Sequence, residues 1–197
     1  MTEKEKMLSG LPYDTTDSEL RKMSNTAKDL MRVYNDIPAE NSDLRNEIIE
    51  KLLGNIGENA RVNQPIYVDY GKNISLGAHS LINMNCTLLD TGEIEIGNNT
   101  LLAPDVKIYT AVHPIEIKDR FLQNGSLCTY TKSVKIGNNV WIGGNTTILP
   151  GVEIGDNTVI GAGSVVTKSI PANVVAYGNP CRVQRYLIEE NENENKS

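Results

Sequence analysis

The sequence predicts a parallel β-helix with three flat sides. A large aliphatic residue returns at every sixth position through residues 136–166, the fifth position of most units is small or β-branched, and Gly, Asn or Asp often stands at position two or four. A short strand and a turn every six residues would close a coil of about 18 residues, with the aliphatic side chains stacked inside. The in-phase residues are Ile136, Ile142, Ile148, Ile154, Ile160 and Val166.

The N-terminal part of the chain carries helical signals instead. After a charged start, Asp17 and Ser18 precede apolar residues at helical spacing, and Ser42 precedes a second such run. Gly54 stands where the last helix should end. The expected organisation is a helical segment over 1–55, a solenoid over 56–180, and a C-terminal segment with a polar, acidic tail over 181–197.

The six-residue rhythm is also present earlier in the chain, and it fails once. Between Ile108 and Ile136 a loop over 111–133 should protrude, and a loop this long in a repeat array is usually functional. It contains His113, whose backbone is restricted by the following Pro114. We therefore predict a catalytic role for His113 rather than that of a solvated loop histidine. The earlier in-phase series are Leu76, Ile82, Leu88 and Ile94, then Ile96, Leu102 and Ile108.

Composition excludes several classes of partner. The formal net charge is -6, which argues against a nucleic acid or an anionic membrane surface as a general partner. The sequence has no signal-peptide core and no apolar run approaching the roughly 20 residues that a membrane span needs, so a cytoplasmic protein is expected. The three cysteines form no CxxC pair, so neither a disulfide framework nor a metal site is predicted.

The IGxN and IGxG hexads resemble the left-handed parallel β-helix of the hexapeptide-repeat acyltransferases. YTAVHPI, VKIGNNVWIGG and GNPCRV, in this order, are similar to segments of the sugar O-acetyltransferases of the maltose and galactoside acetyltransferase group, and the resemblance spans about residues 3 to 187. It implies a left-handed β-helix, a homotrimer with active sites between subunits, and acetyl-CoA as the acetyl donor. It also implies that His113 is the general base and that a sugar hydroxyl is the acceptor.

The chemistry of the residues agrees with this resemblance. Direct transfer of an acetyl group to a hydroxyl needs a base that takes the hydroxyl proton, and an imidazole suits that task. A carbonyl or carboxylate should hold the other ring nitrogen, so that the nitrogen facing the acceptor is unprotonated. A backbone N–H within 141–144 should stabilise the tetrahedral oxyanion, and Gly144 stands where some relatives carry a serine.

The resemblance also implies the binding residues. Asn83 and Asp90 are expected on one face, although Asp90, followed by Thr91 and Gly92, could instead close a turn. Arginine and lysine suit the phosphates of coenzyme A. Tyr177 departs from the small residue usual before GNP. The expected acceptor-binding residues are Asp14, Asp69, Asn83, Asp90 and Leu127, and the expected donor-binding residues are Trp141, Gly144, Ala162, Thr167, Lys168, Arg182 and Arg185.

Three alternatives stay open at this point. The acceptor of the acetyl group could be an antibiotic, an amino acid or a nucleotide sugar. The chain could be a structural solenoid without catalytic activity, because a fold by itself does not imply a function. A zinc enzyme of the β-helix carbonic anhydrase type is disfavoured, because it needs three imidazoles per metal and the chain has only His79 and His113.

Overall fold

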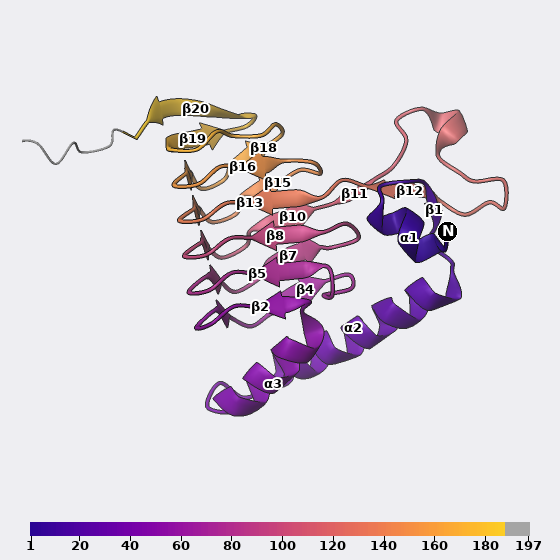
Figure 1. Cartoon of the computed structure of the whole chain (residues 1–197), viewed down its shortest axis with the longest axis horizontal. Coiled ribbons are helices and arrows are strands. Elements are labelled where there is room, and N and C mark those ends of the chain that lie inside the picture. Colours follow the sequence, from indigo (N-terminus) through magenta and orange to yellow (C-terminus); the bar gives the residue numbers. More distant parts are fainter. Residues whose placement is uncertain (188–197) are drawn as a thin grey trace, which may run out of the picture.

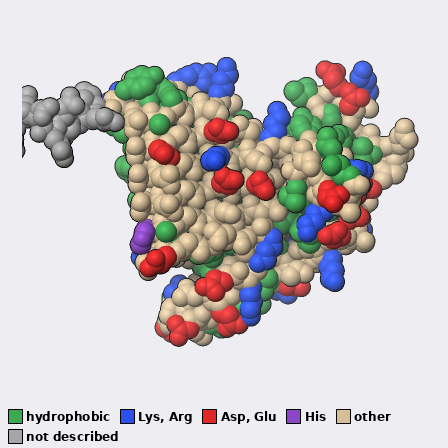
Figure 2. Space-filling model, viewed as in Figure 1, with side chains coloured by type: hydrophobic (Ala, Val, Ile, Leu, Met, Phe, Trp, Pro, Cys, Tyr) green, Lys and Arg blue, Asp and Glu red, His purple; other side chains and the backbone are tan. Residues whose placement is uncertain are grey.

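The computed structural model describes residues 1–187, so residues 188–197 of the expected C-terminal segment lie outside the described residues. Two long helices run beneath one end of a solenoid, and a loop projects from its side (Figure 1), which the space-filling view shows as a part standing out from the body of the molecule (Figure 2). The helices are α1 (Glu3–Leu8), α2 (Ser18–Asp36) and α3 (Ser42–Leu52). The Asp17 carboxylate caps α2 by accepting from the N–H groups of Glu19 and Leu20 at 2.9 and 3.1 Å, as the sequence predicts.

The solenoid has three parallel sheets, which we call faces 1, 2 and 3 in the order in which the chain visits them. Face 1 contains β2 (Asn55–Ile56), β5 (Ile74–Leu76), β8 (Ile94–Ile96), β13 (Val134–Ile136) and β16 (Glu153–Ile154). Face 2 contains β3 (Arg61–Val62), β6 (Leu81–Ile82), β9 (Leu101–Leu102), β14 (Trp141–Ile142) and β17 (Val159–Ile160). Face 3 contains β4 (Ile66–Val68), β7 (Cys86–Leu89), β10 (Lys107–Tyr109), β15 (Thr147–Ile148) and β18 (Val165–Val166). The predicted β-helix is confirmed.

The periodic aliphatic residues fill the inside of this prism. Ile142, Ile148 and Ile160 are 0% exposed, and each pairs in register with an aliphatic residue of the coil above or below. The polar residues at the fifth position are buried too, but their hydroxyls are satisfied. Thr146 donates to the carbonyl of Gly143 at 2.7 Å, and Ser164 donates to that of Gly161 at 2.6 Å. The repeat therefore buries aliphatic surface in every coil without leaving these hydroxyls unpaired.

Asparagine turns the chain at the corners. Asn85, Asn139 and Asn157 have φ values between 56° and 60°, in the left-handed region that asparagine tolerates better than most residues. The side-chain amide of Asn139 donates to Asn157 at 2.9 Å, so stacked turns are also joined to each other. These observations confirm the turn positions predicted from the hexads.

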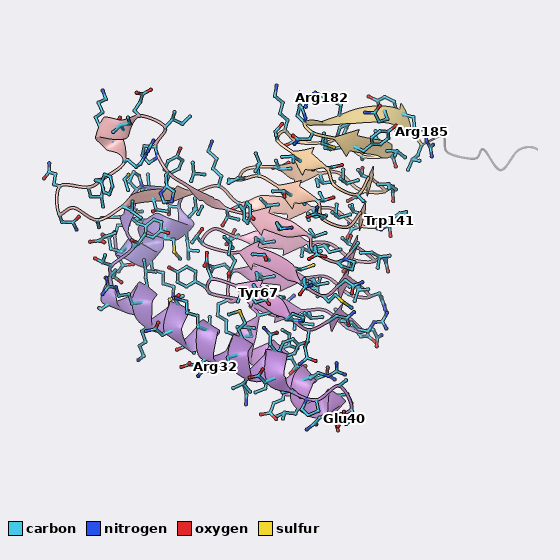
Figure 3. All side chains as sticks on the ribbon, turned by 180° about the vertical axis from the view of Figure 1, so that it is seen from behind. Arg32, Glu40, Tyr67, Trp141, Arg182 and Arg185 are labelled. Atoms are coloured by element: carbon cyan, nitrogen blue, oxygen red, sulfur yellow. The ribbon has the colours of Figure 1, made fainter. Side chains whose placement is uncertain are left out.

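Two corners of the prism matter for the site, and both border face 3. We call the turns that follow the face 2 strands the glycine edge; they comprise 63–65, 83–85, 103–105, 143–145 and 161–163. We call the turns that follow the face 3 strands the loop edge; they comprise 69–73, 90–93, 149–152 and 167–169. Figure 3 shows face 3 around Tyr67, with the protruding loop on one side and Trp141 on the other.

The protruding loop leaves the loop edge after β10 and is tied to the N-terminus. Its base is a three-stranded antiparallel sheet in which β12 (Cys128–Thr131) lies between β11 (Ala111–Val112) and β1 (Tyr13–Asp14). A short 3-10 helix, Ile117–Asp119, lies within the loop. The hydroxyl of Thr131 donates to the carbonyl of Met7 at 2.6 Å, which joins β12 to α1.

A hairpin closes the C-terminal end of the solenoid. β19 (Val174–Gly178) continues face 2 above β17, and β20 (Cys181–Tyr186) returns antiparallel to it. Cys181 is 3% exposed and belongs to the main hydrophobic core. β20 therefore packs against the end of the solenoid through Cys181.

Candidate active site

His113 stands directly after β11, at the end of the three-stranded sheet. Its Nδ1 lies 3.0 Å from the backbone carbonyl oxygen of Cys128 and 3.4 Å from the hydroxyl of Thr129. Because a carbonyl oxygen only accepts, Nδ1 carries the proton, and Nε2 keeps a free lone pair. The side chain is exposed. The ring is therefore oriented by backbone, with its basic nitrogen open to solvent.

The N-terminal segment fixes the carbonyl that orients this ring. In the antiparallel pair of β1 and β12, Asp14 lies opposite Cys128 and Tyr13 lies opposite Thr129. The backbone N–H of Asp14 donates to the Glu3 carboxylate at 2.6 Å, which joins β1 to α1. This pairing could not be read from the sequence, because two short strands separated by more than a hundred residues leave no periodic pattern.

Asp14 also meets the tip of the loop. Its Oδ2 accepts a hydrogen bond from the side-chain amide of Asn124 at 2.7 Å, and its Oδ1 accepts from the backbone and hydroxyl of Thr16 at 2.8 Å each. The bond from the Thr16 backbone is the largest of the effects that lower the pKa of Asp14. Leu127, next to Cys128, is 45% exposed. The structure thus brings three of the predicted residues together, namely Asp14, His113 and Leu127.

Asp90 has a structural position on the loop edge. It is 0% exposed, and its carboxylate accepts from the backbone N–H groups of Asp69, Tyr70 and Asn73 at 3.0, 2.9 and 3.2 Å. Burial raises the pKa of Asp90 to about 6, although these N–H groups act in the opposite direction. The carboxylate has no surface with which to touch a substrate. The structure therefore does not support the predicted direct contact, and the carboxylate of Asp90 stabilises the turn 69–73 of the preceding coil rather than its own turn.

Asp69 lies on the turn that Asp90 holds. Its side chain is only partly exposed, and burial raises the pKa of its carboxyl. The pKa of Tyr13 is raised mainly by burial, and also by the nearby side chains of Tyr70 and Asp69. Asp69 therefore lies close to β1, the strand that pairs with β12. Of the two predicted aspartates on the loop edge, Asp69 is the one that can reach a ligand.

Asn83 belongs to the other edge. It follows β6, and its Oδ1 accepts from the Asn63 side chain at 3.1 Å and from the Met84 backbone at 2.9 Å. Face 3 separates it from the loop edge, since the four-residue strand β7 alone spans roughly 13 Å. The expectation that one face holds Asn83 beside Asp90 is corrected: the two residues flank face 3 at its opposite borders.

The predicted donor residues lie at four places on the solenoid. Gly144 and Ala162 lie on the glycine edge, while the exposed Thr167 and Lys168 follow β18 on the loop edge. Trp141 lies on face 2 just before the glycine edge and is 54% exposed. Arg182 and Arg185 lie on β20, at the C-terminal end of the solenoid (Figure 3). A single chain therefore does not bring His113 to the glycine edge.

Neither a metal cluster nor a membrane helix appears in the part of the chain that the structure describes. Across residues 1–187 no group of three or more His, Cys, Asp or Glu side chains could hold a metal ion. Within the same residues no helix is both long and apolar enough to cross a bilayer.

Two family models match the chain. The model for the bacterial transferase hexapeptide (six repeats) matches residues 133–168, and the maltose acetyltransferase hexapeptide capping motif matches residues 6–57. The first match covers the last coils of the solenoid, and the second covers the end of α1, the helices α2 and α3, and the start of the first coil.

Known proteins are similar over nearly the whole chain. The galactoside O-acetyltransferase of Escherichia coli K12 is 43% identical over 181 residues, which cover 92% of this chain and 83% of that protein. The crystal structure of a maltose O-acetyltransferase from Clostridium difficile 630 is 50% identical with a TM-score of 0.92, covering 96% of this chain and 99% of that one. A galactoside acetyltransferase in complex with coenzyme A is 40% identical with a TM-score of 0.89, covering 95% and 92%.

Proposed function

Because the chain belongs to the family of hexapeptide-repeat maltose and galactoside O-acetyltransferases, we propose that it transfers the acetyl group of acetyl-CoA to a hydroxyl of a sugar. The observation that carries the mechanism is the hydrogen bond between Nδ1 of His113 and the carbonyl of Cys128. It leaves Nε2 as an unprotonated base on an exposed side chain, as a reaction with a large substrate requires.

The transfer is direct and has two steps. The sugar oxygen attacks the thioester carbonyl carbon while Nε2 of His113 takes the hydroxyl proton, which gives a tetrahedral intermediate and an imidazolium. The intermediate then collapses, the carbon–sulfur bond breaks, and the imidazolium returns the proton to the coenzyme A sulfur. The Cys128 carbonyl stabilises the imidazolium, because the Nδ1 proton points at it throughout.

The oxyanion of the intermediate needs a hydrogen-bond donor, and Gly144 is the best candidate within 141–144. The N–H groups of Trp141 and Gly143 already donate to the carbonyls of Thr158 and Ile160 at 2.9 and 2.7 Å. Within residues 1–187 the N–H of Gly144 donates to no protein group. A backbone amide that is fixed and unpaired is suited to a charge that develops only in the transition state.

The sugar binds between the loop and the solenoid. Asp14 and Asp69 supply carboxylates for sugar hydroxyls, and Leu127 supplies an apolar wall beside His113. Asn83 joins this site only from a neighbouring subunit, since it lies across face 3 from His113 of its own chain. Carboxylates and an amide arranged around a base match the directional hydrogen bonds that sugars make.

This geometry supports assembly as a homotrimer with shared sites, because one chain holds the base and the donor-binding edge on opposite borders of face 3. A neighbour that packs beside face 3 joins the loop edge of one chain to the glycine edge of the next. Face 2 offers further contact surface, since Leu101 and Trp141 pair in register and are 45% and 54% exposed.

Sedimentation equilibrium should therefore give three times the 21.7 kDa chain mass. We expect this mass at all concentrations that support turnover, because the active site is incomplete in a monomer. An active species of 21.7 kDa would contradict the shared site.

Replacing Arg182 by Ala should raise the Michaelis constant for acetyl-CoA roughly 10- to 150-fold, because a charge-assisted phosphate contact contributes about 1.5–3 kcal/mol. The constant for the sugar should change little. Arg32→Ala is the matched control. Arg32 is an exposed arginine on α2, and α2 lies at the end of the molecule opposite Arg182 (Figure 3). An equal rise of both constants in Arg182→Ala would point to misfolding instead.

The sugar itself is best found by a screen for acetyl-CoA-dependent release of coenzyme A. Purified protein is tested with maltose, glucose, galactosides and longer oligosaccharides, and NMR of the product identifies the acetylated hydroxyl. Release with a simple sugar supports the proposal. Release only with an antibiotic, an amino acid or a nucleotide sugar would replace the acceptor class but keep the transferase chemistry.

A further inference from the structure

An exposed aromatic side chain stands where the glycine edge meets the last hairpin. Tyr177 of β19 is 51% exposed, and in residues 1–187 its hydroxyl makes no hydrogen bond. The preceding Ala176 is 0% exposed, so the alternation along a strand directs Tyr177 outward. A Cβ built on Gly161 would lie only 2.7 Å from the Cβ of Tyr177. Tyr177 therefore extends from directly above Gly161.

The neighbours of Tyr177 are those of a nucleotide site. Arg182 lies opposite it in the antiparallel pair of β19 and β20, and side chains directly opposite each other share a face of the sheet. One guanidinium nitrogen of Arg182 donates to the Cys181 carbonyl at 2.8 Å, which fixes the side chain and leaves other donors open. Below Tyr177, Ala162 is exposed and Gly163 has open space where a side chain would be.

We propose that Tyr177 binds the adenine ring of coenzyme A by stacking and so makes this enzyme selective for donors that carry the nucleotide. The inference rests on the proposed function. The phosphates lie against Arg182, the adenine lies on the face of the tyrosine ring, and the pantetheine arm descends along Ala162 and Gly163. An aromatic ring suits a purine because every base has a π-face, and the stack needs no hydrogen bond from the tyrosine hydroxyl.

The test compares two donors that differ only in the nucleotide. With Tyr177→Ala, the Michaelis constant for acetyl-CoA should rise about tenfold, within the range known for loss of one base–aromatic stack. The constant for acetylated pantetheine, which has no adenine, should stay at the native value, as should turnover at saturation. Tyr177→Phe keeps the ring and should behave like the native protein. Tyr186→Ala is the control, since Tyr186 is an exposed tyrosine at the far end of β20.

Two outcomes would overturn the inference. An unchanged constant for acetyl-CoA in Tyr177→Ala would exclude a contact with the donor, and an equal rise for both donors would assign Tyr177 to subunit packing. Calorimetric titration with coenzyme A separates this inference from the proposed function, because binding needs no acceptor. Tenfold weaker binding in Tyr177→Ala, without acetylation of any sugar, would support the adenine contact and reject the sugar transferase. Absence of binding to the native protein would reject both.

Discussion

His113→Ala should lower turnover roughly 10²- to 10⁴-fold, the usual contribution of a general base. The Michaelis constant for acetyl-CoA should change little, because none of the predicted donor-binding residues lies in the protruding loop that carries His113. The fold should be unaffected, since the His113 side chain is exposed and its Nδ1 bonds to a single carbonyl. Initial rates with saturating sugar, together with circular dichroism of the variant, make the measurement.

His79→Ala provides the matched control, because the two histidines are the only ones in the chain. His79 is exposed on a turn after face 1, with φ of 58°. Its replacement by Ala should leave turnover within about twofold of the native value. A folded His113→Ala protein with near-native turnover would refute the assignment and make the loop a lid or specificity element.

The solenoid could be predicted from the sequence because each coil repeats the same local pattern of strand and turn. An aliphatic residue must point inward and a turn must follow it, so Ile142 and Asn145 carry the same information as their counterparts 18 residues later, Ile160 and Gly163. Parallel pairing then follows from stacking alone. The helices were equally predictable, since caps such as Asp17 act within one turn.

The supports of His113 could not be predicted in the same way. The Cys128 carbonyl that orients the ring is backbone, so no side chain marks it. The strand that holds Cys128 in place comes from residues 13–14, and a contact of such sequence separation leaves no local pattern. The resemblance placed Asp14 in the site, and the structure adds the reason, because β1 carries this residue to the loop.

The separation of Asn83 from Asp90 was, by contrast, readable from the hexads. Ile82 and Leu88 are consecutive members of one series, so they must lie on consecutive faces, and the residues that follow them must lie on consecutive corners. The proximity of Asn83 and Asp90 in sequence suggested that they share one face, whereas the phase of the repeat places them at two different corners. Phase within a coil decides position in a solenoid, and sequence distance does not.

For Asp90, the type of the side chain led to the wrong expectation. A carboxylate near the site resembles a substrate contact, yet this one is 0% exposed and accepts from three backbone N–H groups of the turn that carries Asp69. We therefore propose that Asp90 contributes to the reaction by holding Asp69 in position. Substitution of such a residue should therefore lower the stability of the fold more than it lowers the affinity for the sugar.

Asp90→Ala should lower the free energy of unfolding by about 1–3 kcal/mol, because the buried N–H group of Tyr70 and the partly buried N–H groups of Asp69 and Asn73 lose their acceptor. Asp90→Asn should lose less, since its Oδ1 can still accept from Asp69 and Tyr70 while its amide faces the N–H of Asn73. Calorimetry at one protein concentration measures both variants, and the ranking expected for Tm is native, then Asn, then Ala. Glu95→Ala, which removes an exposed ion pair with Lys135, should leave Tm nearly unchanged. An Asp90→Ala protein with native Tm and a raised Michaelis constant for the sugar would restore the direct substrate contact.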